Sequence, residues 1–210
     1  MARRIAALAL LLALAAAPAA ARTDQAATPA YPEIAYHDST PVGLWWAGSL
    51  RQGTQLPAEG ADWFTWDPVL RRAPNRGWRR WGTDRLVATV TGVIEEYRLA
   101  HPFSPRIGIG DLSRPRGGNF GRRYGALGHA SHQNGLDADI YYPRIDGLER
   151  RAPAPALVDR VAAQELVDRF VAAGARAVYV GPRLGLQGPR KVVTPLVHHD
   201  DHLHVRLPLR

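Results

Sequence analysis

Two short stretches of the sequence hold six of its eight histidines, together with four aspartates. Residues 128–139 read GHASHQNGLDAD, and residues 198–207 read HHDDHLHVRL. Neutral imidazoles and carboxylates are side chains that bind zinc, and the same groups transfer protons in hydrolytic reactions. The two stretches therefore indicate a metal site, a site of acid–base chemistry, or both.

The first stretch leads into a segment in which polar and apolar side chains alternate. If residues 137–142 form a strand, Asp137 and Asp139 point to one face and Ala138 and Ile140 to the other. The apolar face suits a protein core. The two carboxylates are then left on the opposite face, where they can take part in chemistry.

The second stretch alternates in the same way, so its histidines at positions 202 and 204 share a face with an arginine. If the two strands are neighbours, Asp139 and His204 converge, and His132 reaches the same point from the loop before the first strand. Two imidazoles and one carboxylate leave the fourth position of a tetrahedral zinc ion free for water, as in catalytic zinc sites. Such an ion lowers the pKa of its water from about 15.7 toward about 7. We therefore expect one zinc ion per chain.

Several other chemistries are excluded by residue types that the sequence lacks. It has no cysteine, which excludes disulfides, cysteine-ligated zinc, iron–sulfur clusters and thiol catalysis. Lys191 is its one lysine, and no serine has a lysine three residues later, which excludes Ser-x-x-Lys peptidases. The helical motif His-Glu-x-x-His is also absent, because no glutamate lies between His129 and His132.

The N-terminus has the pattern of an export signal. Two arginines precede an apolar run at residues 5–17, and small residues follow it. Thirteen apolar residues are too few to span a bilayer, and no later segment is apolar enough, so we expect no stable membrane insertion. We predict a cleaved signal peptide at residues 1–21, a linker or arm at 22–40 and one domain at 41–210. The mature protein is then periplasmic, or secreted and associated with the cell wall.

The elements that position the histidines follow from hydrophobic periodicity. Helical spacing, with Thr83 as an N-cap and Pro102 beyond the end, marks the clearest helix. We expect an α+β domain with long loops and a small, mainly antiparallel sheet flanked by helices. The expected helices are residues 83–100 and 159–173, and the expected strands are residues 106–109, 137–142, 177–180 and 202–207.

The charge balance is basic, with 27 Lys+Arg against 19 Asp+Glu and a formal net charge of +8. The sequence has no recognised nucleic-acid-binding motif, and export makes a nucleic-acid partner the weaker interpretation. Arginine suits pairing with carboxylates, which the cell wall presents. Arginines of the loop at residues 111–128 either bind substrate carboxylates or are simply solvated; these are Arg114, Arg116, Arg122 and Arg123.

The residues that suggest metal chemistry also resemble a known pattern. His132, Gly135 and Asp139, followed by His202-Leu203-His204, resemble the zinc signature shared by lysostaphin-type endopeptidases, D-alanyl-D-alanine peptidases and the hedgehog domain. The fuller strings of the two stretches, together with Gly110-Asp111-Leu112-Ser113, are similar to those of penicillin-insensitive murein endopeptidases. This resemblance extends over roughly residues 48–207.

The resemblance implies a role for each histidine. His132, Asp139 and His204 match the three zinc ligands. His202 matches a histidine beside the metal that helps to activate water or to stabilise the tetrahedral intermediate. His129 and His199 match further histidines of the active site.

The sequence therefore predicts a zinc metallopeptidase whose partners are peptidoglycan stem peptides and their cross-links. The expected reaction is hydrolysis of D-alanyl–diaminopimelyl-type cross-links by an endopeptidase that penicillin does not inhibit. One alternative is a D,D-carboxypeptidase or dipeptidase of the same superfamily. Another is a non-catalytic, metal-containing module that binds the cell wall. The sequence leaves the oligomeric state open.

Overall fold

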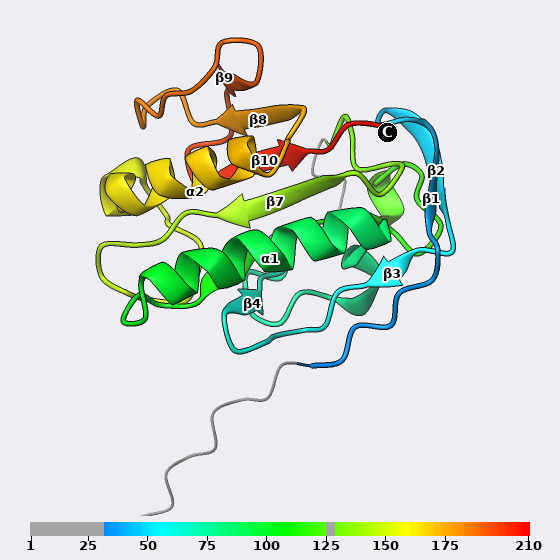
Figure 1. Cartoon of the computed structure of the whole chain (residues 1–210), viewed down its shortest axis with the longest axis horizontal. Helices are drawn as coiled ribbons and strands as arrows, with labels where there is room; N and C mark the ends of the chain where they lie inside the picture. Colours follow the sequence, from blue (N-terminus) through cyan, green and yellow to red (C-terminus); the bar gives the residue numbers. More distant parts are fainter. Residues whose placement is uncertain (1–31, 125–128) are drawn as a thin grey trace, which may run out of the picture.

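The computed structural model describes residues 32–124 and 129–210. These residues form a six-stranded sheet, two α-helices and two small two-stranded sheets (Figure 1). The predicted signal peptide at residues 1–21 lies outside the described residues, as does the first half of the predicted arm, so both remain predictions. Within the described part of the chain, no helix is long and apolar enough to cross a membrane.

The six-stranded sheet has the order β4-β6-β7-β10-β8-β9. Its central pairs, β6–β7, β7–β10 and β10–β8, are antiparallel as expected, but the outer pairs β4–β6 and β8–β9 are parallel. The α+β class is confirmed. The sheet differs from the expected, mainly antiparallel one at its edges, where the outermost strands pair in parallel. The strands are β4 (Trp63–Thr65), β6 (Ile107–Ile109), β7 (Asp137–Tyr141), β10 (His202–Arg206), β8 (Ala177–Val180) and β9 (Val193–Pro195).

Strands β7 and β10 are adjacent at the centre of the sheet, as the sequence predicts. Their register places His204 directly opposite Asp139. On the other face of the same two strands, Ala138, Leu203 and Val205 are completely buried in the main core. The alternation of side chains therefore separates a core face from a polar face.

Both α-helices lie on the core face of the sheet, side by side (Figure 1). In α1 (Asp84–Ala100), the Thr83 hydroxyl accepts a hydrogen bond from the Leu86 amide at 3.1 Å, which confirms the predicted N-cap. In α2 (Arg160–Ala172), the N-cap is Asp159. The buried face of α2 consists of Ala163, Leu166, Val167 and Phe170, with Ala162 and Val171 partly buried against the same core. Because the described helices cover one face, the polar face of β7 and β10 stays open.

Residues 40–82, which include all six tryptophans of the sequence, contain strands that the sequence did not predict. β1 (Thr40–Leu44) and β2 (Ala47–Arg51) form a hairpin with Trp45 at its tip, and β3 (Thr54–Gln55) pairs with β5 (Trp81–Gly82). Trp63 is buried in the core, whereas Trp45 lines a cleft. Three short 3-10 helices complete the described elements: η1 (Gly77–Arg79), η2 (Arg122–Tyr124) and η3 (Pro155–Leu157).

The described end of the N-terminal arm is fixed to the start of α1 by Asp84. The Asp84 carboxylate accepts hydrogen bonds from the backbone amides of His37 and Ser39 and from the Thr54 hydroxyl. Burial alone would raise the pKa of Asp84, but these hydrogen bonds outweigh it and hold the pKa below its usual value. The ionised form of this side chain therefore stabilises the folded state.

We expect the substitution Asp84→Asn to lower the free energy of unfolding by about 1 kcal/mol at pH 7. A carboxyl group whose pKa is lower in the folded state stabilises the fold above its unfolded-state pKa of about 3.9 and loses that contribution as pH falls further. The difference between variant and parent should therefore shrink below about pH 4. Urea titrations followed by tryptophan fluorescence measure it, with Glu95→Gln on the exposed side of α1 as control. A difference that is independent of pH would contradict this account.

Candidate metal centre

Three of the predicted ligands meet on the polar face of β7 and β10. The Oδ1 atom of Asp139 lies 3.3 Å from Nε2 of His132 and 3.1 Å from Nδ1 of His204. Two atoms that each lie about 2.0–2.1 Å from one tetrahedral zinc ion are about 3.3–3.4 Å apart. Each of these two separations therefore suits a pair of donors that share a single small cation.

The other ring nitrogen of each histidine is held by a hydrogen bond. Nδ1 of His132 donates to the carbonyl of Leu112 at 2.6 Å, and Nε2 of His204 lies 2.8 Å from a carboxylate oxygen of Asp137. Each partner turns the opposite ring nitrogen toward Asp139. Burial alone would lower the pKa of His204, but Asp137 and Asp139 raise it to about 9, so an ion bound at Nδ1 would displace a proton that is shared with Asp139. Both rings are therefore oriented to bind a metal ion.

The His132 side chain shows most directly that a cation fits here. Its Nε2 is buried and has no hydrogen-bond partner among the described residues. His132 also has a left-handed backbone, with φ of 65°, which is unfavourable for a residue with a side chain. Burial lowers the pKa of His132 and so favours the neutral imidazole that metals bind. A zinc ion would coordinate this nitrogen, which otherwise makes no hydrogen bond among the described residues and lies 3.3 Å from Asp139.

The carboxylate of Asp139 supplies the negative charge that a site for a cation needs. Burial alone would raise its pKa, but the neighbouring His132 and His202 hold it well below its usual range. Asp139 is therefore ionised. Two imidazoles and one carboxylate form a donor set typical of zinc.

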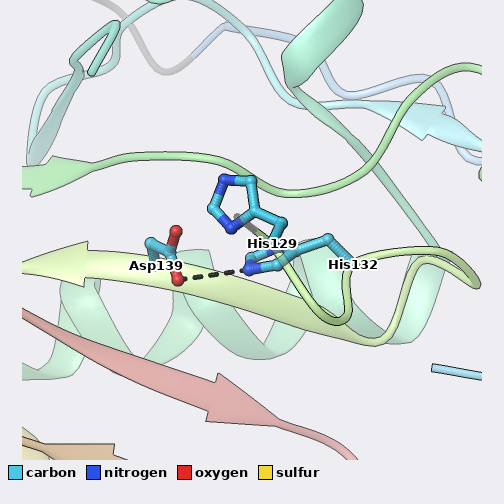
Figure 2. Close-up of side chains that lie close together, drawn as sticks. All are labelled: His129, His132 and Asp139. Atoms are coloured by element: carbon cyan, nitrogen blue, oxygen red, sulfur yellow. Dashed lines mark ion pairs between the residues drawn. The ribbon is translucent and has the colours of Figure 1, made fainter. Parts of the chain in front are cut away.

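A second group of three possible ligands overlaps the first. His129, His132 and Asp139 each offer a ligand atom, and these atoms lie within 4.8 Å of one another (Figure 2). In this group His129 takes the place of His204. Nε2 of His129 is already held by Asp111 at 2.7 Å, whereas Nδ1 of His204 faces Asp139 at 3.1 Å, so we favour His204 as the third ligand.

His129 is held by a buried ion pair that the sequence analysis missed. Its Nε2 lies 2.7 Å from Asp111, which is fully buried and bound by the fully buried Arg79. Burial alone would raise the pKa of Asp111, but His129 and Arg79 lower it. The sequence held one signal for this pair: Asp111 is an acidic residue two positions after the buried strand β6. Nothing in the sequence marked Arg79 as its partner.

His202 and His199 lie beside the proposed ligands. His202 Nδ1 is 2.7 Å from Asp201, and its Nε2 is 3.8 Å from Asp139 Oδ1. Burial alone would lower the pKa of His202, but Asp139 and Asp201 together raise it above its usual value. The ring of His199 lies 4.8 Å from that of His202, centroid to centroid, and burial lowers its pKa. A histidine with a raised pKa and a histidine with a lowered pKa are thus neighbours.

The predicted site residues share one cleft of about 790 Å³. His132 lies beneath its surface and is fully buried, whereas the other five line it: His129, Asp139, His199, His202 and His204. Of the loop arginines whose side chains are described, none lines this cleft; Arg114 instead donates to Asn119 and Tyr124. The side chain of Arg123 lies outside the described part.

A family model matches the part of the chain that holds most of these residues. The model of the penicillin-insensitive murein endopeptidases matches residues 41–179, which is more than half of the chain. The chain belongs to this family. The matched range includes His129, His132 and Asp139 but ends before β10, so the position of His204 in the site is argued from strand pairing.

Curated members of the penicillin-insensitive murein endopeptidase family resemble the chain at low identity. The Haemophilus influenzae member is 26% identical over 197 residues, covering 80% of this chain and 63% of the relative. The Pectobacterium atrosepticum member is 28% identical over 186 residues, covering 76% and 63%. The Yersinia enterocolitica member is 31% identical over 125 residues, covering 47% and 44%. The chain thus spans less than two thirds of each of these family members.

The two overlapping ligand groups make different predictions for zinc binding. We expect His204→Ala to weaken zinc binding by more than about 100-fold, beyond the loss typical of a residue that only orients a ligand. His129→Ala should weaken binding by less than about 10-fold. Competition with a chromogenic zinc chelator measures both affinities, and His101→Ala, outside the cleft, is the matched control. The opposite ranking would place His129 in the ligand set instead.

Proposed function

We propose that this protein is a zinc-dependent murein endopeptidase that hydrolyses D-alanyl–diaminopimelyl-type cross-links. Family membership supports action on murein, which implies a periplasmic or extracellular location. The observation that carries the zinc dependence is the spacing of His132, Asp139 and His204 around one point. The open cleft above that point has room for an extended peptide substrate.

Three side chains would hold the ion: His132 through Nε2, Asp139 through its carboxylate and His204 through Nδ1. A bound zinc ion supplies the Lewis acidity that activates water and polarises a peptide carbonyl. Asp137 holds the ring of His204, and the Leu112 carbonyl holds the ring of His132, so neither ligand has to reorient on binding.

His202 is the proposed general acid. Asp201 fixes its ring through Nδ1, which leaves Nε2 facing the centre. The raised pKa of His202 shifts its ring toward the protonated form that a general acid needs. From this position it can donate a hydrogen bond to the oxyanion that develops on the attacked carbonyl, and then a proton to the leaving amine.

Two further histidines assist in the proposed mechanism. His129, held by Asp111, lies on the other side of His132 and is a second candidate to transfer a proton to the leaving amine. His199, whose lowered pKa keeps it neutral, lies against His202 and lines the cleft. The mechanism requires no serine nucleophile, so a β-lactam has no group to acylate.

The proposal predicts that the zinc-loaded protein releases monomers from purified murein and from isolated cross-linked dimers. A chelator should abolish this cleavage and added zinc restore it, whereas penicillin should have no effect. Mass analysis of the digested peptides identifies the bond that is broken. Uncross-linked pentapeptides, tested in parallel, should be cleaved much more slowly; preferential loss of their terminal residue would instead indicate a D,D-carboxypeptidase.

The matched variant for this experiment is His202→Ala. We expect it to retain zinc and to lose about 100-fold or more in kcat, the contribution typical of a positioned general acid. A parent protein that binds murein and zinc but cleaves nothing would contradict the proposed activity and favour a binding module. Cleavage that persists without any metal would contradict the zinc dependence.

A further inference from the structure

Three of the site histidines are held in the same way. Each donates to or pairs with an aspartate, and each aspartate also pairs with an arginine. The three chains of contacts are Arg206–Asp137–His204, Arg79–Asp111–His129 and Arg151–Asp201–His202. The third chain differs from the other two in the exposure of its arginine.

The side chains of Arg79 and Arg206 are buried or nearly buried and bind other residues of the protein. The side chain of Arg79 is 0% exposed and also donates to the carbonyl of Tyr124. Arg206 is 8% exposed, donates through Nε to Asp137 and stacks on the ring of Trp45 at 4.3 Å. Both guanidinium groups are thus buried or nearly buried and paired with an aspartate.

Arg151 lines the same cleft, but its side chain is 37% exposed. Its Nη1 lies 3.2 Å from Oδ2 of Asp201, whose other oxygen binds His202. A guanidinium has five N–H donors. Apart from Asp201, the described residues provide no hydrogen-bond partner for the donors of Arg151. An incompletely paired arginine therefore stands in the cleft, one aspartate away from the proposed general acid.

We propose that Arg151 binds a carboxylate of the substrate next to the bond that is cleaved, and that it determines specificity for substrates with this group. The planar fork of arginine suits two parallel hydrogen bonds to a carboxylate. This inference rests on the proposed function, and it fits the chemistry of that substrate. In a D-alanyl–diaminopimelyl cross-link, the carbon that bears the leaving amine also bears a carboxylate.

Arg151 is not one of the loop arginines that the sequence suggested as ligands of substrate carboxylates, and its position in the fold explains the difference. The loop arginine Arg114 is engaged with Asn119 and Tyr124, and Arg116 lines a separate hollow. Arg151 follows the turn after β7 and approaches the cleft beside His202. The carboxylate site is therefore at the His202 end of β10, where Arg151 is exposed, whereas Arg206 at the other end is nearly buried.

The test compares two cross-linked dimers that differ only in having a carboxylate or a carboxamide beside the scissile bond. The parent protein should prefer the carboxylate by about 10-fold or more in kcat/KM. Arg151→Met should abolish this preference, and Arg151→Lys should keep part of it. Arg150→Met, at the exposed neighbouring position, is the matched control and should behave as the parent.

Equal losses on both dimers in Arg151→Met would overturn the proposal, because they would mean that Arg151 acts only through Asp201 and His202. Absence of a preference in the parent would overturn it as well. If Arg151→Met does not fold, Arg151→Lys provides the test. An undiminished preference of that variant for the carboxylate dimer would contradict the two parallel hydrogen bonds proposed for Arg151.

Binding separates this proposal from the proposed hydrolysis. Two dimers in which the scissile amide is replaced by a –CH2–NH– linkage cannot be cleaved, and calorimetry gives their affinities for the metal-loaded protein. Tighter binding of the carboxylate form, lost in Arg151→Met, supports the Arg151 site even if the protein cleaves no dimer and the endopeptidase proposal fails. Equal affinities of the parent for both forms overturn the Arg151 site, whether or not hydrolysis is observed.

Discussion

The site depends on the antiparallel pairing of β7 with β10. In this register His204 is opposite Asp139, and Arg206 is opposite Asp137. A slip of one residue would turn every side chain of β10 to the other face and bring Leu203 and Val205 out of the core. Since those two residues are fully buried, the hydrophobic core enforces the register on which the candidate metal centre depends.

Around this strand pair, charge is balanced through repeated contacts between arginine, aspartate and histidine. Burying a carboxylate without partners is costly, and each of the three aspartates that hold a histidine has an arginine as its second partner. This arrangement uses part of the arginine excess to orient imidazoles rather than to attract a polyanion. It also provides rigid imidazole orientations before any metal or substrate binds.

The sequence predicted the parts of the fold whose signal is local. Alternation identified β7 and β10, and helical spacing with an N-cap at Thr83 identified α1, because each pattern reports one buried face. Strands β1–β5 and β9 were not predicted: most have two or three residues, too few to show a period, and the β1–β2 hairpin has no buried face with regular alternation. The Arg79–Asp111 pair was missed because the two residues are distant in sequence and meet only through folding.

The central claim is that one divalent ion binds where the two histidine stretches meet. Anomalous diffraction at the zinc absorption edge from zinc-loaded crystals tests it most directly. The account predicts a single strong peak per chain, about 2.0–2.1 Å from His132 Nε2, from an Asp139 oxygen and from His204 Nδ1. A centre with no peak, or a peak ligated by His129 while His204 stays bound to Asp137 away from the ion, would contradict it.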